Sequence, residues 1–169
     1  MGLLDILQQY AGNNQAPQSD VHQHFDEVAP QVSQQDLGNG IAAAFRSDAT
    51  PPFGQMVGNL FDRSNPQQQA GVLNQLVQSL GSGGLGSVAG GVLGRILGTG
   101  SSSAAPNITP EQASQISPAD VNAIAVHAEK QDPSIVDRVG AFYAQHPTLV
   151  KTLGAVALSA VMGQLSSRR

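Results

Sequence analysis

The side chains with the clearest potential for chemistry are histidines, and two of the four lie close together. His22 and His24 are followed by Asp26 and Glu27, and imidazoles with carboxylates are ligands that divalent transition metals accept. The segment is typical of a helix, in which residues two apart point about 200° away from each other. The two imidazoles therefore cannot hold one ion, although His22 shares a face with Asp26 and His24 roughly with Glu27. A solvated polar face is the favoured interpretation, and a weak metal site is the alternative.

The other two histidines stand apart from any acidic or nucleophilic partner in the sequence. His127 lies in the apolar stretch 125–128, where a partly buried imidazole that bonds to a carbonyl is expected. His146 precedes Pro147 and is typical of a turn or a helix cap. Neither position predicts catalysis.

No combination of residues in the sequence matches an enzyme site. A Ser-His-Asp arrangement and a pair of acid and base carboxylates do not emerge, and the glycine-rich segment lacks the Lys-Ser/Thr ending of a phosphate loop. The absence of cysteine excludes disulfides, thiolate zinc sites and cysteine nucleophiles. We therefore predict a protein that is not an enzyme and has no cofactor, bound metal or small-molecule substrate.

The amino-acid composition limits the classes of partner that the chain can bind. The formal net charge is −4 with only 8 Lys and Arg in 169 residues, whereas phosphate binding needs clustered basic side chains. Nucleic acid is therefore excluded as a partner. The first five residues, MGLLD, lack the basic region and apolar run of a secretory signal, and together with the lack of cysteine this favours the cytoplasm.

The elements that must position any site are helices. Alanine, leucine and glutamine are abundant and favour helices, and no β-branched alternation predicts a strand. The sequence predicts an all-α protein. The expected helices cover residues 2–11, 20–29, 34–46, 52–63, 66–80, 118–131, 133–145 and 147–165.

The most informative feature of the sequence is an internal duplication. The matched pairs are 31–37 with 115–121, 53–61 with 135–143, and 65–66 with 146–147. Their offset falls from 84 (115 − 31) to 81 (146 − 65) along the chain, and the drift lies in loops, where deletions are tolerated. We therefore expect two related three-helix units that pack together.

The expected organisation follows from this duplication. Helices in 1–30 precede a first repeat, 31–80, and a second repeat covers 108–169. A glycine-rich helix and linker, 81–107, join the two repeats.

Both repeats begin with the same helix-start chemistry. Ser33 and Ser117 can accept backbone N–H bonds, and Asp36 and Asp120 follow three residues later and can reach back to complete a capping box. Asn65 is expected to cap the helix after it. These five residues are the predicted caps.

Glycines between the repeats follow a regular spacing. Gly86, Gly90, Gly94 and Gly98 recur at every fourth position, which places them on one helix face, and such a face lets two helix backbones approach closely. Each helical glycine costs about 1 kcal/mol relative to alanine. We therefore expect a helix whose glycine face packs on another helix of this chain or on a second copy. A flexible linker and membrane insertion are the alternatives.

Two apolar stretches are candidates for membrane spans. The first, 85–97, contains Arg95, and both it and 152–165 are shorter than the ~20 residues that a bilayer requires. A central core helix is the favoured interpretation of 152–165.

Three parts of the sequence carry a family resemblance: the opening MGLLD, the glycine-rich middle, and ITPEQ at 108–112. With these, the chain resembles the bacterial YidB-like group of small helical proteins. The resemblance implies a bacterial helical protein without an assigned activity, and it carries over no catalytic residue. The string HAEKQDPSIVDRV at 127–139 is similar to one that recurs in uncharacterised bacterial proteins.

These observations favour a structural or interaction protein that forms a homo-oligomer through apolar and glycine-faced helices in the bacterial cytoplasm. The alternative is an envelope-associated or lipid-binding helical protein that uses 84–98 and 150–165. A third hypothesis, an enzyme or metal-binding protein centred on the histidines, is the least favoured.

Overall fold

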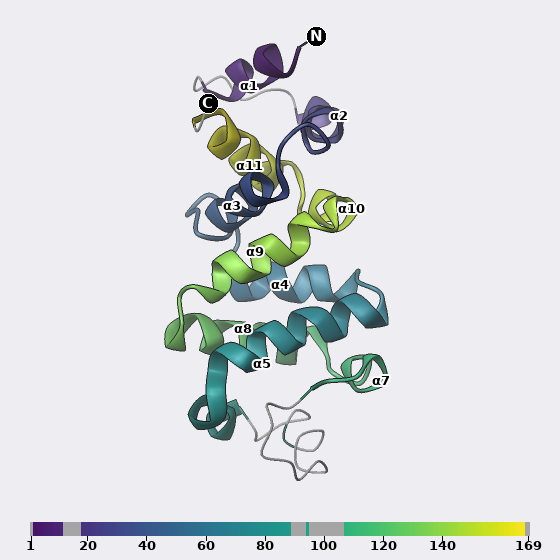
Figure 1. Cartoon of the computed structure of the whole chain (residues 1–169), viewed down its shortest axis with the longest axis vertical. Helices are drawn as coiled ribbons and strands as arrows, with labels where there is room; N and C mark the ends of the chain where they lie inside the picture. The colour runs from purple at the N-terminus through teal and green to yellow at the C-terminus, as the bar shows by residue number, and fades with distance from the viewer. Residues whose placement is uncertain (1, 12–17, 89–93, 95–106, 168–169) are drawn as a thin grey trace. The chain divides into compact units, whose positions relative to one another are not determined.

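The computed structural model of the chain is helical throughout the part that it describes, which comprises residues 2–11, 18–88, 94 and 107–167. Figure 1 shows these helices without a strand among the described residues. The all-α class expected from composition and periodicity is confirmed.

Most of the helices are short. Before the glycine-rich segment they are α1 Leu3–Ala11, α2 Gln18–Val28, α3 Gln34–Phe45, α4 Phe53–Asp62 and α5 Pro66–Val88. After it they are α7 Pro110–Ala113, α8 Pro118–Gln131, α9 Ile135–Ala144, α10 Pro147–Val150, the 3-10 turn η1 Lys151–Leu153, and α11 Ala155–Ser167. Most bounds differ from those expected by a few residues at most. Helix α7 is additional to the expected helices, and the larger departures, in α5 and after Pro147, are described next.

Proline and glycine fix most of the helix boundaries. Pro66, Pro118 and Pro147 each occupy the first position of a helix, where the missing N–H leaves no backbone acceptor unpaired. Gly81, expected to end the helix 66–80, has φ 58° and ψ −176° and interrupts α5. That conformation belongs to a region that only glycine adopts readily, so α5 is two helical pieces on either side of Gly81.

The single helix expected over 147–165 is wrong. The chain instead forms α10 and η1, then α11, with a bend of 120° between the two pieces. The break lies at Gly154, which has φ 91° and ψ 168°. The uniform apolar composition of this stretch concealed the break, because a glycine within an Ala- and Leu-rich run is compatible with a continuous helix until its backbone angles are known.

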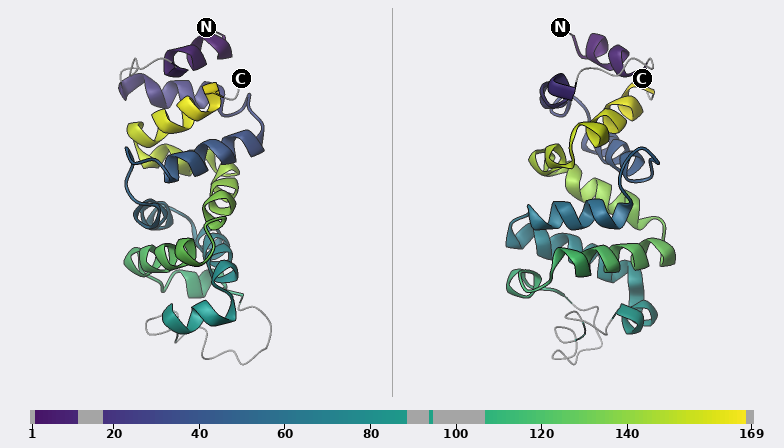
Figure 2. Two further views of the ribbon diagram at one scale, coloured as in Figure 1. Left: turned by 90° about the vertical axis from the view of Figure 1, so that its left-hand side faces the viewer. Right: turned by 180° about the vertical axis from the view of Figure 1, so that it is seen from behind.

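The helices divide into two compact units, and each draws on distant parts of the sequence. Unit 1 consists of 1–52 with 137–169, and unit 2 consists of 53–136. Figure 2 gives two further views of the same helices.

In unit 1 the last helix is central. Helix α11 lies against α1, α2 and α3 and buries Leu158, Val161 and Met162. Phe25, Ile41 and Tyr143 are among the largest side chains that are fully buried around it. The apolar face of α11 is therefore used within the unit, as expected for a core helix.

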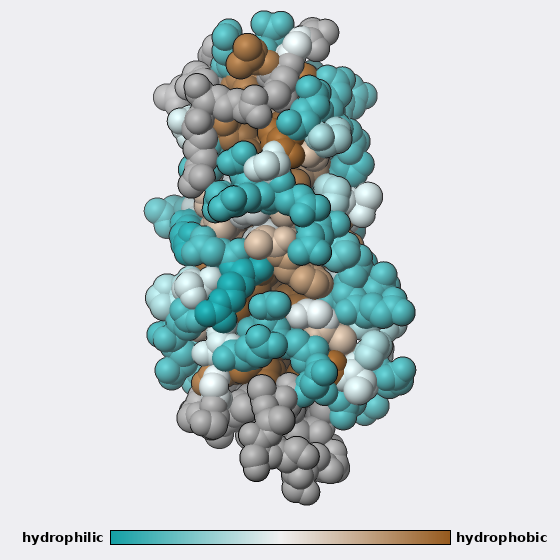
Figure 3. All heavy atoms as spheres, viewed as in Figure 1, coloured by the Kyte–Doolittle hydropathy of each residue, from teal (hydrophilic) through white to brown (hydrophobic). Residues whose placement is uncertain are grey.

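In unit 2 helix α8 takes the corresponding central place. It packs on α4 and α5, and the short helix α7 packs on α5. Leu60, Leu73 and Ile124 are fully buried there. On the face drawn in Figure 3, hydrophilic residues are spread over the surface and apolar residues show between them.

Helices of the two proposed repeats are mixed in both compact units. Unit 1 combines α3, the first helix of the first repeat, with α9, α10 and α11 from the second. Unit 2 combines α8, the first helix of the second repeat, with α4 and α5 from the first. The sequence could not reveal this exchange, because helix-start signals fix where a helix begins and carry no information on which helix it meets.

Candidate functional site

The features that stand out in the structure are helix ends and helix-docking faces. At the start of α3, the Asp36 N–H donates to Ser33 Oγ over 3.1 Å, and Ser33 Oγ donates to Asp36 Oδ2 over 2.7 Å. At the start of α8, the Asp120 N–H donates to Ser117 Oγ over 3.2 Å, and Ser117 Oγ donates to Asp120 Oδ2 over 2.7 Å. The two helices begin with the same geometry, although each carboxylate binds the serine hydroxyl rather than the backbone N–H that a full capping box would use.

Asn65 caps α5 in a reciprocal arrangement. The Gln68 N–H donates to Asn65 Oδ1 over 2.9 Å, and the Asn65 N–H donates to Gln68 Oε1 over 3.0 Å. His146 occupies the matching place before α10 and makes no side-chain cap bond. All five sequence-predicted cap residues thus lie at helix starts.

Glycines bring helices of unit 1 into backbone contact. A Cβ atom placed on Gly140 of α9 would lie 2.6 Å from the Gly38 carbonyl oxygen and 3.1 Å from the Ala42 nitrogen, both on α3. A Cβ on Gly38 would in turn lie 3.0 Å from Ala141 Cα. These spacings leave no room for a side chain, so α3 and α9 dock through bare backbone.

The same kind of contact holds unit 2 together. A Cβ on Gly58 of α4 would lie 2.8 Å from the Pro118 carbonyl oxygen on α8, and one on Gly54 would lie 2.5 Å from Asn122 Oδ1. Real Cβ atoms essentially never come closer than 3.0 Å. Glycine at these positions is therefore a requirement of the helix packing.

The predicted packing face of the glycine-rich segment is only partly within the described residues. Gly86 lies in the second piece of α5, and Gly94 is helical. Gly90 and Gly98 lie outside the described residues, so the packing of this face stays a prediction.

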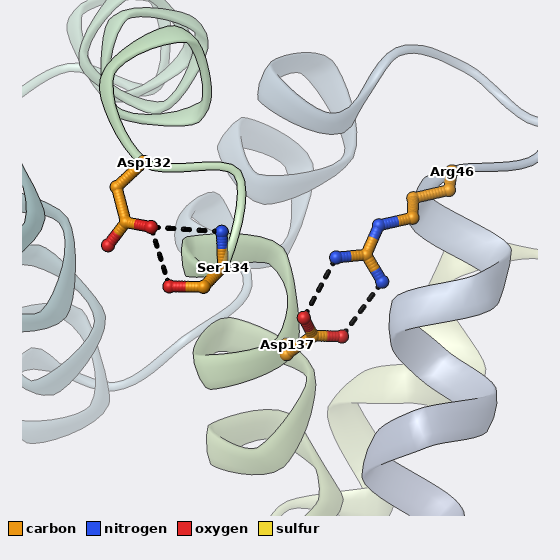
Figure 4. Close-up of polar contacts among 4 residues, drawn as sticks. All are labelled: Arg46, Asp132, Ser134 and Asp137. Atoms are coloured by element: carbon orange, nitrogen blue, oxygen red, sulfur yellow. Dashed lines mark hydrogen bonds and ion pairs between the residues drawn. The ribbon is translucent and has the colours of Figure 1, made fainter.

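Two ion pairs cross between helices of unit 1. Figure 4 shows Arg46, at the end of α3, with its guanidinium turned to Asp137 in the first turn of α9, and each of the two nitrogen–oxygen distances is 2.8 Å. The hydrogen bond from Arg46 lowers the pKa of the Asp137 carboxyl, the guanidinium charge lowers it further, and partial burial opposes both. Lys151 Nζ makes the second pair, with Asp26 at 2.8 and 3.0 Å.

Figure 4 also shows the turn that leads into α9. Asp132 Oδ1 accepts from the Ser134 N–H over 3.1 Å and from Ser134 Oγ over 2.6 Å. This local bonding is typical of an Asx turn, and it accounts for the start of α9 after Pro133. Within the string 127–139, Asp132, Ser134 and Asp137 therefore have structural partners.

Of the histidines, His24 has a specific partner that the sequence did not suggest. The Tyr10 hydroxyl lies 3.0 Å from His24 Nδ1, and the two rings meet edge to face at a centroid distance of 6.0 Å. Burial raises the pKa of the Tyr10 phenol, and the negative charge of Asp20 raises it further. This contact ties α1 to α2. Among the described residues, no group of three or more His, Cys, Asp or Glu side chains could hold a metal ion.

A second feature that sequence reasoning missed is a backbone clamp in unit 2. Asn74 of α5 donates through Nδ2 to the Ile108 carbonyl over 3.1 Å and accepts from the Ile108 N–H over 2.8 Å. The side-chain amide satisfies both backbone groups of Ile108, which is itself buried. The only signal in the sequence is an asparagine next to the apolar stripe of a helix.

One open hollow of about 350 Å³ lies in unit 1, where the connection between α2 and α3 faces the α9–α10 turn. Its walls are Asp26, Ala29, Pro30, Val32, Gln34, Leu37, Ala144, Gln145, Pro147 and Thr148. They bring together one carboxylate, amides and small apolar groups, without a nucleophile–base pair that could carry a reaction.

Comparison with protein-family models, with curated proteins and with solved structures found no match. Among the described residues, no helix taken alone has the length and apolarity to cross a membrane. The bent pair 147–153 with 155–167 reaches them only when its two pieces are counted together.

Proposed function

We propose that this chain is a helical interaction protein that is not an enzyme and associates with further copies of itself. The observation that carries the proposal is the way its helices dock. At Gly38, Gly54, Gly58 and Gly140, a Cβ atom would come within 3.0 Å of a neighbouring helix. In both units, glycine at these positions lets neighbouring helices approach closely.

Helix faces of this kind are specific docking elements. Without side chains between them, two helix backbones approach closely, and many weak dispersion contacts accumulate over the shared surface. The four-residue glycine spacing of 86–98 presents the same kind of face. We infer that a second copy of the chain docks on it.

The polar groups of the described residues support a role other than catalysis. Arg46 with Asp137 and Lys151 with Asp26 are ion pairs that join helices at the surface, and Tyr10 pairs with His24. A catalytic triad needs a nucleophile that bonds to a base, and a third group that orients the base. The contacts described here do not form such a set. Elemental analysis of untagged protein is expected to find no stoichiometric metal, and one zinc or nickel ion lost on His22→Ala or His24→Ala would contradict this.

The lipid-binding alternative draws less support. Leu158, Val161 and Met162 of α11 are buried against other helices of unit 1, so they are not available to a bilayer while the unit is folded. Flotation of the protein with liposomes of neutral and of anionic lipid separates the two functions. Self-association predicts that the protein stays at the bottom of the gradient with both.

The decisive experiment compares two double variants by light scattering over a range of concentrations. Gly90→Leu/Gly94→Leu blocks the proposed face, whereas Ser87→Leu/Gly91→Leu adds two leucines in the same segment on another helix row. We expect the parent and the second variant to form oligomers and the first variant to have the mass of a monomer. A parent that is monomeric at every concentration would overturn the proposal, and so would equal masses for the two variants.

A further inference from the structure

The two compact units are built by reciprocal exchange between the two halves of the chain. The first half, residues 2–88, contributes α1–α3 to unit 1 and α4–α5 to unit 2. The second half, residues 107–167, contributes α7 and α8 to unit 2 and the segment from Asp137 onward to unit 1. Neither half contains a whole unit, so each half needs the other to bury its apolar faces.

The docking contacts on the two sides of this exchange occupy matching sequence positions. In unit 2, Gly58 of the first half faces α8 of the second half, and its nearest neighbours there are Pro118 and Asn122. In unit 1, Gly140 of the second half faces Gly38 and Ala42 on α3 of the first half.

The sequence duplication relates these contacts pair by pair. Gly140 corresponds to Gly58 at an offset of 82 (140 − 58), and Asn122 corresponds to Gly38 at an offset of 84 (122 − 38). Gly58 therefore approaches α8, and Gly140 approaches α3, in corresponding regions of the two repeats. The closest approach differs by one helix turn, because Pro118 corresponds to Gln34 rather than to Gly38. This reciprocity is what a pair of identical subunits with exchanged first helices would show.

We propose that the two halves are interlocked repeats, and that a second copy of the chain supplies the complementary half in a dimer. The proposal rests on the self-association proposed above and adds a second route to it, one that does not use the glycine face of 86–98. In such a dimer, the first half of one copy packs with the second half of the other, and the helix contacts are those of the single chain. Its partner is therefore a second copy of this chain.

The exchange costs little free energy because the dimer keeps the helix contacts of the single chain. The halves are connected only through 89–106, so the closed chain and the dimer differ chiefly in whether this connection lies within one copy or is shared by a pair. The closed form is favoured because the connection within one copy holds the two halves at an effective concentration on the order of millimolar. Refolding at high protein concentration raises the share of the dimer, and dilution after refolding does not reverse it quickly because the units must open first.

Single cysteines detect the exchange, since the chain has none of its own. Arg46 lies in the first half and Asp137 in the second, and they touch within unit 1. Chains with R46C are mixed with chains with D137C, unfolded, refolded together at high concentration, and treated with a short bis-maleimide. A covalent dimer forms efficiently only where one copy's first half packs with the other copy's second half. The control mixes the same two kinds of chain after each has refolded alone, so that the two halves of every copy are already paired.

A second cysteine pair keeps the test valid if R46C or D137C prevents folding. Asp26 of the first half contacts Lys151 of the second, so chains with D26C and K151C are mixed in the same way. We expect both pairs to give several-fold more covalent dimer than the control and the yield to rise with refolding concentration. Oligomers by light scattering without this excess in either pair would overturn the exchange while leaving self-association in place. A monomer at every concentration would overturn both.

Interlocking within one chain is tested by cutting it. A protease site placed at 101–103, in a stretch of serine and alanine, allows the folded full-length protein to be nicked. We expect the two pieces to elute together and to separate only in denaturant. Pieces that separate in native buffer, each with full helical signal, would overturn the reciprocal assembly.

Discussion

The carbonyl oxygen of Gly38 lies where the side chain of residue 140 would begin, 2.6 Å from a Cβ atom built on Gly140. The two residues are far apart in the sequence, and they dock helices from the two different repeats. A glycine pair of this kind fixes both the distance and the rotation of two helices, because any other residue on either side would push them apart. The assembly of unit 1 thus depends on the absence of two side chains.

Gly140→Ala should destabilise the protein by about 1–3 kcal/mol, the usual cost of overpacking. The obstructing atom belongs to the α3 backbone, which cannot rotate away as a side chain does. Alanine is also a better helix former than glycine by about 1 kcal/mol. This gain offsets part of the steric cost, so the net loss of stability lies toward the lower end of the range. Gly163→Ala is the matched control, since the nearest atom to its Cβ is 3.9 Å away and the change should stabilise. Urea unfolding measures both, and equal effects of the two substitutions would contradict the close packing.

Loss of either serine cap should destabilise by about 1 kcal/mol. Ser33→Ala and Ser117→Ala each remove an acceptor for a backbone N–H and a donor to a carboxylate. Ser159→Ala serves as the control, because its hydroxyl bonds to the Ala155 carbonyl within a helix and alanine is the better helix former. Thermal melts of the three variants should separate the caps from the control. A cap variant that melts with the parent would show that its hydroxyl bonds do not stabilise the helix start.

The ion pair between Arg46 and Asp137 should make stability depend on acid pH. The folded protein has the lower pKa at Asp137, so the pair stabilises above the unfolded pKa of about 3.9. The effect disappears as the pH falls through the folded value. The side chains are 46% and 51% exposed, and solvent screening therefore limits the gain to about 1 kcal/mol or less.

Arg46→Gln should accordingly lower the free energy of unfolding at neutral pH and have progressively less effect below pH ~4. Added salt should shrink the difference as well. Arg63→Gln removes the same charge from an exposed position in unit 2 and is the control. A loss from Arg46→Gln that stays constant down to strongly acid pH would show that packing, rather than the pair, is responsible.

Local features of the fold could be read from the sequence, and long-range ones could not. Ser33 and Asp36 predict a helix start because all the atoms of the cap hydrogen bonds lie within four residues of the chain. Gly81 similarly marks the end of the helix 66–80. The docking of Gly58 on Pro118 and of Gly140 on Gly38 depends instead on the shapes of helices that are distant in the chain. No local pattern encodes such a choice of partner.

The proposed duplication is the one long-range signal in the sequence, and it does not predict which helices share a compact unit. Repeated segments suggest repeated units, yet each unit takes its first helix from the other repeat. Packing within one repeat and packing between the two repeats would bury the same apolar helix faces. An amphipathic helix buries its apolar face equally well against a neighbour that comes before it or after it in the chain. The Asn74 clamp on Ile108 escaped notice for a related reason, since its partner is an extended backbone 34 residues away.

Gly154 offers the cleanest test of how the second repeat departs from the first. Its backbone, at φ 91° and ψ 168°, lies in a region that is essentially restricted to glycine. No atom lies within 4 Å of a Cβ built there, so a substitution meets strain in the backbone and no steric obstacle. Gly154→Ala should therefore destabilise by about 1–3 kcal/mol, and Gly163→Ala, within α11, should not.

The conformational origin of that loss can be separated from a change of fold. If alanine at 154 simply straightened the chain into one continuous helix over 147–165, the helical signal in circular dichroism would rise and the contacts of α11 with α1, α2 and α3 would be broken. We expect instead an unchanged spectrum with a lower melting temperature, because burial of Leu158, Val161 and Met162 holds α11 in place. A rise in helical content, or a melting temperature equal to the parent's, would show that the bend does not require glycine.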